Sequence, residues 1–250
     1  MLRYVALGDS TAEGLQDPDG QGGYVGWADR LAGHLKAAHG GVAYANLAVR
    51  GLRASEIRTR QLGSALALRP QVASVVGGVN DFLRPRFDAD VVAAEVRFMI
   101  AALRATGARV ITFTMPDMTP VNPLAGLIRG RLVALNERLR RTCRDTGALL
   151  LDLEHTPVSR DPRLWAEDRL HPSTAGHERI AAGLAWVLGL TGFDDWAREI
   201  VEAPEKSLSD RARRELAWST RWFLPWVVRH AVGRSSAHGR VAKRPELRPL

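Results

Sequence analysis

Along the first 190 or so residues, short apolar runs alternate with longer stretches in which apolar side chains recur every three or four positions. The short runs are apolar on both faces of an extended chain, and turn-forming residues follow them. This pattern is typical of buried strands in a parallel sheet, because helices cover both faces of such a sheet. Five runs fit the pattern: residues 3–9, 42–49, 71–78, 108–115 and 148–154.

The longer stretches have the spacing of amphipathic helices. In residues 90–106, for example, Val92, Val96 and Met99 fall on one face. Because strand and helix alternate, we predict an α/β fold whose parallel sheet has helices on both faces. A functional site is expected at the carboxyl ends of the strands. The other predicted helices cover residues 25–38, 54–68, 127–146 and 173–190.

The alternation of strand and helix stops near Gly192, which marks a domain boundary. We predict one domain over residues 1–192, a helical tryptophan-bearing extension over 193–232 and a basic, flexible tail over 233–250. A chain of 250 residues, of which 46% are hydrophobic, is long enough for one full core with such an appendage.

The positive charge of the chain is concentrated at its end. The formal net charge is +8, and residues 221–250 contain seven Arg or Lys against the single acid Glu246, so this stretch accounts for +6. The remainder is nearly neutral and offers no basic groove, so the distribution disfavours a nucleic-acid partner. A lone cysteine, Cys143, and the lack of a visible secretory signal or membrane-spanning run favour a cytoplasmic protein.

The first strand runs directly into the small polar turn "GDST", which ends in Ser10 and Thr11. Such a turn suits the start of a helix, and Ser10 then acts only as a helix cap. Alternatively, Ser10 is a nucleophile at the carboxyl end of a strand. A serine nucleophile needs a base, and the base needs an orienting group. In "DRLHP", Asp168 and His171 lie three residues apart before a predicted helix, where they are either this pair or surface loop residues.

Acyl transfer also needs donors for an oxyanion. Gly51 follows the second predicted strand, and Asn80 in "GVND" follows the third. Each of these residues is also common in ordinary turns, so neither is diagnostic by itself.

Taken in order, the turn with Ser10, the turn with Gly51, "GVND" and "DRLHP" resemble the motifs of the SGNH hydrolases, also called GDSL-type esterases and lipases. The resemblance covers about the first 190 residues. It implies a flavodoxin-like three-layer α/β/α sandwich with a parallel five-stranded sheet. It also implies that Ser10 is the nucleophile, His171 the base and Asp168 its orienting acid. The Ser10 N–H, Gly51 and Asn80 would then form the oxyanion hole.

Thr11 departs from this resemblance, because it replaces the leucine that gives the GDSL motif its name. That position takes no part in the chemistry, so the departure concerns the subfamily rather than the activity. We therefore predict a serine hydrolase that cleaves a small-molecule or lipid ester through an acyl-enzyme, with no cofactor and no metal. Acyl transfer to a sugar or lipid alcohol, and a non-catalytic binding protein on the same fold, remain alternatives. Candidate pocket residues are Met115, Met118, Leu124 and Trp165.

The extension places Trp218, Trp222 and Trp226 four residues apart, on one face of a predicted helix that Pro225 kinks or ends. Three interpretations remain open for this face. The tryptophans pack a helix onto the domain, they contact an anionic membrane surface peripherally, or they stack on the bases of a nucleic acid.

Overall fold

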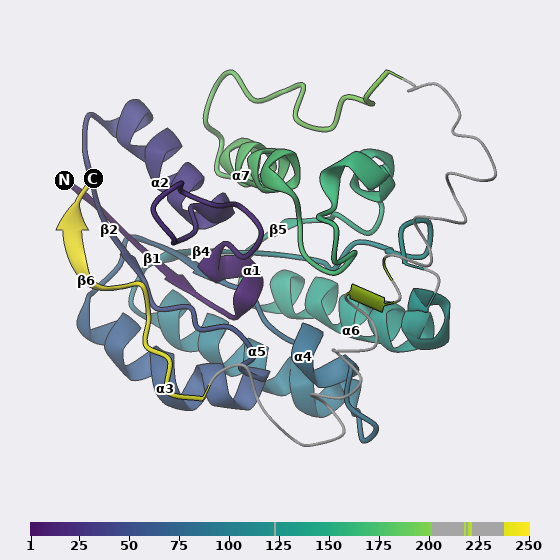
Figure 1. Cartoon of the computed structure of the whole chain (residues 1–250). Helices are drawn as coiled ribbons and strands as arrows, with labels where there is room; N and C mark the ends of the chain where they lie inside the picture. Colours follow the sequence, from purple (N-terminus) through teal and green to yellow (C-terminus); the bar gives the residue numbers. More distant parts are fainter. Residues whose placement is uncertain (123, 202–217, 219, 222–237) are drawn as a thin grey trace.

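The structure, a computed structural model, describes residues 1–122, 124–201, 218, 220–221 and 238–250. In this part of the chain a central sheet has six strands in the order β5-β4-β3-β1-β2-β6 (Figure 1). β1 to β5 are the five strands predicted from the sequence, and each pairs in parallel with its neighbours among them. Their bounds are β1 Leu2–Leu7, β2 Val42–Asn46, β3 Val72–Val75, β4 Arg109–Phe113 and β5 Leu149–Leu151.

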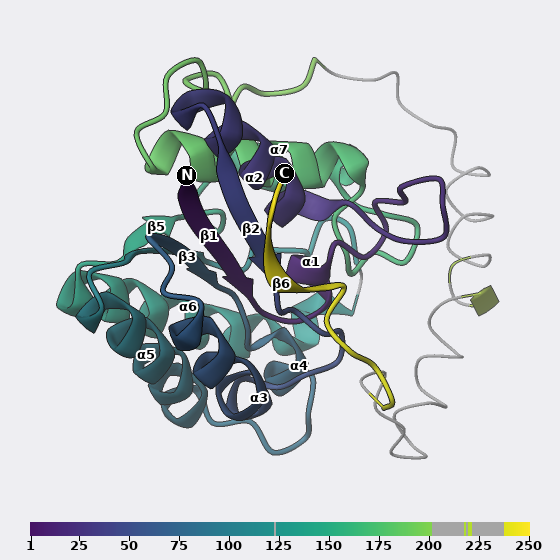
Figure 2. The same ribbon diagram turned by 90° about the vertical axis from the view of Figure 1, so that its left-hand side faces the viewer.

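Helices cover both faces of the sheet, so the predicted three-layer α/β/α sandwich is confirmed (Figures 1 and 2). One face holds α1 (Ser10–Glu13), α2 (Gly26–His39) and α7 (Thr174–Val187). Between β5 and α7 lie two short 3₁₀ helices, η1 (Pro157–Arg160) and η2 (Pro162–Leu164). The other face holds α3 (Ala54–Ala67), α4 (Val79–Phe82), α5 (Ala89–Ala105) and α6 (Ala125–Thr146).

This layering explains why the strands are apolar on both faces. Every residue of β2 and β3 is buried, since helices pack against them from both sides. Capping residues determine where the helices that cover the sheet begin and end. Ser173 caps α7 by accepting a hydrogen bond from the Gly176 N–H, and α2 ends at Gly40, whose φ of 71° suits glycine.

The strand order places β1 between β2 and β3, so the crossover after β1 leads to one side of it and the crossover after β2 leads back past β1 to the other side. In an open α/β sheet such a reversal opens a crevice beyond the carboxyl ends of the strands, where ligands bind. The turns after β1, β2 and β3 contain Ser10, Gly51 and Asn80. The topology therefore brings three of the five candidate residues to one edge of the sheet.

The structure corrects the prediction for the end of the chain. Residues 244–249, predicted to be part of a flexible tail, form the strand β6 (Arg244–Pro249), which pairs antiparallel with β2. Arg244 donates to the Tyr44 carbonyl at 2.9 Å, and Lys243 donates to the Val25 carbonyl at 2.6 Å. A proline near each end of β6 suits only an edge strand, and the edge beyond β2 is where it lies.

Of the three extension tryptophans, Trp218 is described, whereas Trp222 and Trp226 lie outside the described residues. The boundary at Gly192, the helical extension and its membrane contact therefore remain predictions. Among the helices described, none combines the length and the apolar character that crossing a bilayer requires.

A buried histidine in α7 bonds to the backbone at the start of α2 and just after α1, in the same layer. His177 in α7 is fully buried, and its Nδ1 accepts a hydrogen bond from the Trp27 N–H at 3.1 Å. Its Nε2 therefore holds the proton and donates to the Leu15 carbonyl at 2.9 Å. Burial lowers the pKa of His177 to about 4, because the charged ring would lose its solvation.

We expect His177 to make stability depend on pH. An unfolded histidine has a pKa of about 6.5. Between pH 6.5 and 4 this residue is therefore protonated in the unfolded chain, whereas the native ring stays neutral. The free energy of unfolding should fall by about 3 kcal/mol over that window from this residue alone. Urea unfolding at several pH values should show a shallower fall for His177→Gln. His39→Gln, at the exposed end of α2, should behave as the wild type, and equal slopes for all three proteins would contradict the assignment.

Candidate active site

Ser10 lies at the first turn of α1, directly after β1, because Gly8 and Asp9 form a tight junction there. A Cβ on Gly8 would come within 2.7 Å of the Val76 carbonyl oxygen, so only glycine lets the end of β1 pass the end of β3. The side-chain amide of Gln61, in α3, clamps Gly8 by accepting from its N–H at 2.8 Å and donating to its carbonyl at 2.9 Å. Two hydrogen bonds thus hold the backbone two residues before Ser10.

The structure brings Ser10, His171 and Asp168 into one chain of hydrogen bonds. His171 Nε2 is 2.9 Å from Ser10 Oγ, and His171 Nδ1 is 2.7 Å from Asp168 Oδ2. The ionised Asp168 accepts the Nδ1 proton, which leaves Nε2 as the acceptor for the Ser10 hydroxyl. This is the arrangement of a serine nucleophile with its base and orienting acid.

The Asp168 carboxylate is also held by backbone and side-chain donors. Its Oδ1 accepts from the N–H groups of Leu170 and His171, both at 3.0 Å. Gln16 donates to Oδ2 at 3.2 Å, a contact for which the sequence contains no signal. Burial raises the pKa of Asp168, but the hydrogen bonds and charge of His171 together with the backbone donors outweigh it and leave the pKa below its usual value. The lowered pKa keeps the Asp168 carboxylate ionised near neutral pH.

Gly51 and Asn80 lie beside the same turn. Asn80 Nδ2 donates to the Leu52 carbonyl at 3.0 Å and, with a longer contact of 3.4 Å, to Asp9 Oδ2. These contacts join Asn80 to the residue next to Gly51 and to the residue next to Ser10. Gly51 has a φ of 81°, and among the described residues no group accepts a hydrogen bond from its N–H. The Ser10 N–H lies in the first turn of α1, where helical N–H groups have no partner within the helix.

Asp9 shapes the turn through its side-chain hydrogen bonds. Its side chain is completely buried and accepts hydrogen bonds from the Thr11 N–H at 3.2 Å and from the Thr11 hydroxyl at 3.0 Å, which caps α1. Burial raises the pKa of Asp9 to about 6. Its contacts do not include the His171 ring nitrogens, which bond to Ser10 and Asp168.

An ion pair that the sequence does not reveal supports the Gly51 turn. Glu13, in α1, accepts from the Arg50 backbone N–H at 2.7 Å and from the Arg50 guanidinium through both carboxylate oxygens. The Arg50 guanidinium also stacks 5.1 Å from the Tyr24 ring centre. Both charged side chains are largely buried, and together they connect the turn after β2 to the helix that begins with Ser10.

An apolar pocket begins beside these residues. It is lined by Thr11 and Val79, which adjoin Ser10 and Asn80 in the chain, and by Leu170 and Pro172 on either side of His171. Three of the four predicted pocket residues line it, and Leu124 does not. Those three are Met115, Met118 and Trp165.

Comparisons with known proteins bear on the family and on the fold. The family model described as GDSL-like lipase/acylhydrolase matches residues 6–179. Among solved structures, an acetylxylan esterase from Geobacillus stearothermophilus superposes with a TM-score of 0.64 at 19% identity, covering 80% of this chain and 97% of that one. An alpha/beta hydrolase from the metagenome of Lake Arreo, Spain, gives 0.64 at 21%, covering 76% and 96%. TesA gives 0.61 at 20%, covering 74% and 97%.

These identities are low, so the superpositions show a shared fold. None of the curated proteins matches the chain in sequence. No group of three or more side chains suited to hold a metal ion occurs in the part of the chain that the structure describes.

Removing the Glu13 charge should destabilise the protein. Glu13→Gln leaves the largely buried Arg50 guanidinium without its counter-charge, so we expect the free energy of unfolding to fall by about 1–3 kcal/mol in urea titrations. Asp145→Asn, which removes one partner of the exposed pair between Asp145 and Arg97, is the control and should change it by less than about 0.5 kcal/mol. Equal effects of the two substitutions would contradict a supporting role for the Glu13 pair.

Proposed function

Because the chain belongs to the GDSL-like lipase/acylhydrolase family, we propose that it hydrolyses carboxylic esters with Ser10 as the nucleophile. One observation above all supports this proposal: the unbroken chain of hydrogen bonds from Ser10 Oγ through both ring nitrogens of His171 to Asp168. In this chain, Ser10 Oγ lies 2.9 Å from His171 Nε2, although the two residues are 161 positions apart in the sequence.

In the first half of the reaction, Ser10 Oγ attacks the ester carbonyl carbon while His171 Nε2 takes the hydroxyl proton. The carbonyl oxygen becomes an oxyanion, and Asp168 stabilises the imidazolium that forms. When the tetrahedral intermediate collapses, the carbon–oxygen bond to the alcohol breaks and His171 returns the proton to the leaving alkoxide. The products of this half are a free alcohol and an acyl group on Ser10.

The oxyanion would be bound by the Ser10 and Gly51 N–H groups and by Asn80 Nδ2. Both backbone groups belong to turns held by rigid contacts, the Gln61 clamp on Gly8 and the Glu13 pair on Arg50. The Asn80 contact to Asp9 is long, so the N–H that makes this contact can turn toward the oxyanion at little cost. Donors fixed before the reaction stabilise developing charge without further reorganisation.

In the second half, water attacks the acyl-enzyme, His171 accepts its proton, and the acid is released as Ser10 regains its hydrogen. An alcohol of a sugar or lipid in place of water would give acyl transfer by the same residues. Product analysis with and without added alcohols distinguishes the two outcomes.

The apolar pocket supports an ester with a short apolar chain. The cavity volume is about 60 Å³, well below the roughly 150 Å³ of an engineered apolar cavity that binds benzene. We therefore propose that the acyl chain enters this pocket and that short acyl chains fit it best.

Ser10→Ala and His171→Ala should each remove nearly all ester turnover, with a loss of kcat on the order of 10⁶-fold, because nucleophile and base act as a unit. Asp168→Asn should cost about 10⁴-fold, since the amide favours the wrong histidine tautomer. Initial rates with p-nitrophenyl esters measure these losses.

Ser64→Ala, at an exposed position of α3, is the matched control for Ser10→Ala and should keep wild-type turnover. Unfolding midpoints show whether each variant is folded. Full activity in folded Ser10→Ala would refute the serine mechanism.

Enlarging the pocket should shift the preferred chain length. Met118→Ala removes a buried pocket side chain, so kcat/KM should rise for octanoyl relative to butyryl esters. Met99→Ala removes the same group from the core of α5, outside the pocket, and should leave that ratio unchanged although both variants lose about 2–5 kcal/mol of stability. An unchanged ratio in Met118→Ala would place the acyl chain elsewhere.

A further inference from the structure

The loop of residues 166–171, which we call the acid loop, holds a strained residue between Asp168 and His171. Arg169 has a φ of 56°, a left-handed conformation that costs a residue with a side chain about 1–3 kcal/mol. The loop closes on itself through the Ala166 N–H, which donates to the His171 carbonyl at 2.9 Å. Such a conformation persists only where surrounding contacts hold it.

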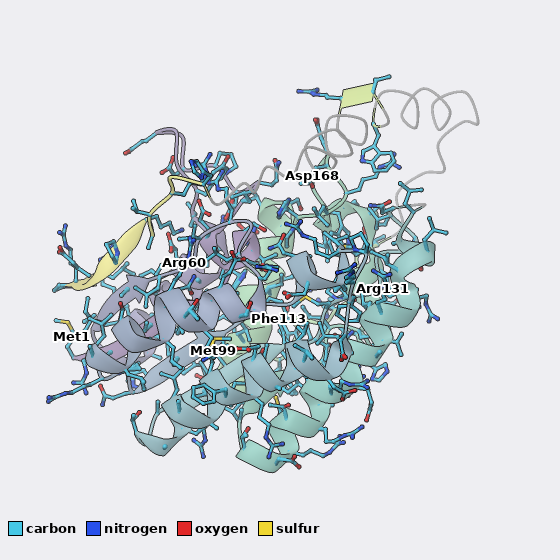
Figure 3. All side chains as sticks on the ribbon, turned by 90° about the horizontal axis from the view of Figure 1, so that it is seen from below. Met1, Arg60, Met99, Phe113, Arg131 and Asp168 are labelled. Carbon is cyan, nitrogen blue, oxygen red and sulfur yellow. The ribbon has the colours of Figure 1, made fainter. Side chains whose placement is uncertain are left out.

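Some of those contacts come from the C-terminal extension. The Trp218 indole N–H donates to the Asp168 carbonyl oxygen at 3.2 Å, and the Arg169 guanidinium lies 4.7 Å from the Trp218 ring centre. Arg221 adds an exposed ion pair with Glu167 at 3.6 Å. Three consecutive residues of the acid loop are therefore contacted by residues 218 and 221. Figure 3 labels Asp168 on the side of the molecule where this short segment lies.

Trp218 is only 8% exposed although it lies outside the matched residues 6–179. Within the matched part, the Asn122 amide reaches the Arg169 carbonyl at 3.4 Å, a weak contact at the limit of hydrogen bonding. The peptide between Asp168 and Arg169 is held at both of its polar groups: its N–H donates to the Ala166 carbonyl at 3.0 Å within the loop, and its carbonyl oxygen accepts from the Trp218 indole.

We propose that Trp218 is a positioning residue for the proposed ester hydrolysis, and that it acts through Asp168. By fixing the carbonyl of Asp168, the indole fixes the backbone torsion that aims the carboxylate at His171 Nδ1. By stacking on Arg169, the ring stabilises the left-handed residue that turns the loop back toward Ser10. The inference rests on the proposed role of the Ser10, His171 and Asp168 chain.

Two variants of the full chain separate the two contacts. Trp218→Phe keeps a ring for Arg169 but removes the indole N–H, and kcat should fall about tenfold, as for one lost hydrogen bond. Trp218→Ala removes both contacts, and kcat should fall about 10²-fold, the effect of a small misplacement of a catalytic group. KM should stay unchanged in both, since Trp218 does not line the pocket.

Phe98→Ala is the matched control. It removes an aromatic ring that stacks on an arginine, Arg58 at 5.4 Å, on the outer face of α5. It should leave kcat and KM unchanged. A rise in KM at constant kcat in Trp218→Ala would make Trp218 a substrate contact and overturn the proposal, as would a lower unfolding midpoint with wild-type kcat.

A second measurement does not depend on turnover. The Leu170 and His171 N–H groups bond to Asp168 Oδ1, so their hydrogen exchange reports the order of the acid loop. Exchange at these two amides should accelerate in Trp218→Ala and stay as in the wild type in Phe98→Ala. Unchanged exchange in Trp218→Ala would refute the positioning role. Faster exchange in a protein that hydrolyses no ester would leave Trp218 as the support of the loop and refute the proposed function instead.

Discussion

The hydrogen bond between Ser10 and His171 is the interaction on which the arrangement of the site depends, because it joins the first turn of the chain to the loop before α7. Its length is set by the packing of α7 against α2, in the layer that also holds α1. His177 connects these helices through backbone groups at Leu15 and Trp27. The fold thus sets the distance between Ser10 and His171.

Buried polar side chains hold the turns around Ser10 more firmly than apolar packing alone could. Asn46, at the end of β2, donates to the Ala12 carbonyl at 2.8 Å and accepts from the Ala48 N–H at 3.0 Å. Gln61 and Glu13 bind backbone groups of the neighbouring turns in the same way. Burying a polar side chain is costly unless it is hydrogen-bonded, so each of these side chains holds the backbone groups that it binds in one geometry. These hydrogen bonds explain how the turns beyond the carboxyl ends of the strands keep their shape without sheet pairing.

Much of the fold and of the candidate site could be predicted because it rests on local patterns. The spacing of apolar residues and the turn residues place β1 to β5 and the long helices within a few residues. The positions of Ser10, Gly51 and Asn80 follow from the strand ends, and the position of the Asp168 loop follows from the start of the helix after it. The strand β6 was missed because its sequence, rich in arginine and proline, has no strand periodicity and depends on an edge supplied by β2. Gln16, Gln61 and the Arg50 pair were missed because their partners lie far away in sequence.

The two hydrogen bonds that join Asp168, His171 and Ser10 depend on different parts of the molecule. The bond from Asp168 to His171 spans three residues, so the conformation of one loop determines it, including the left-handed Arg169. The bond from His171 to Ser10 spans 161 residues, so the packing of whole helices determines it. A disturbance of the acid loop therefore changes how the His171 ring is oriented without moving Ser10. A disturbance between α2 and α7 separates His171 from Ser10 while the turn around each residue persists. Support for the acid loop can accordingly come from outside the sandwich, since that loop needs only a local contact to keep its shape.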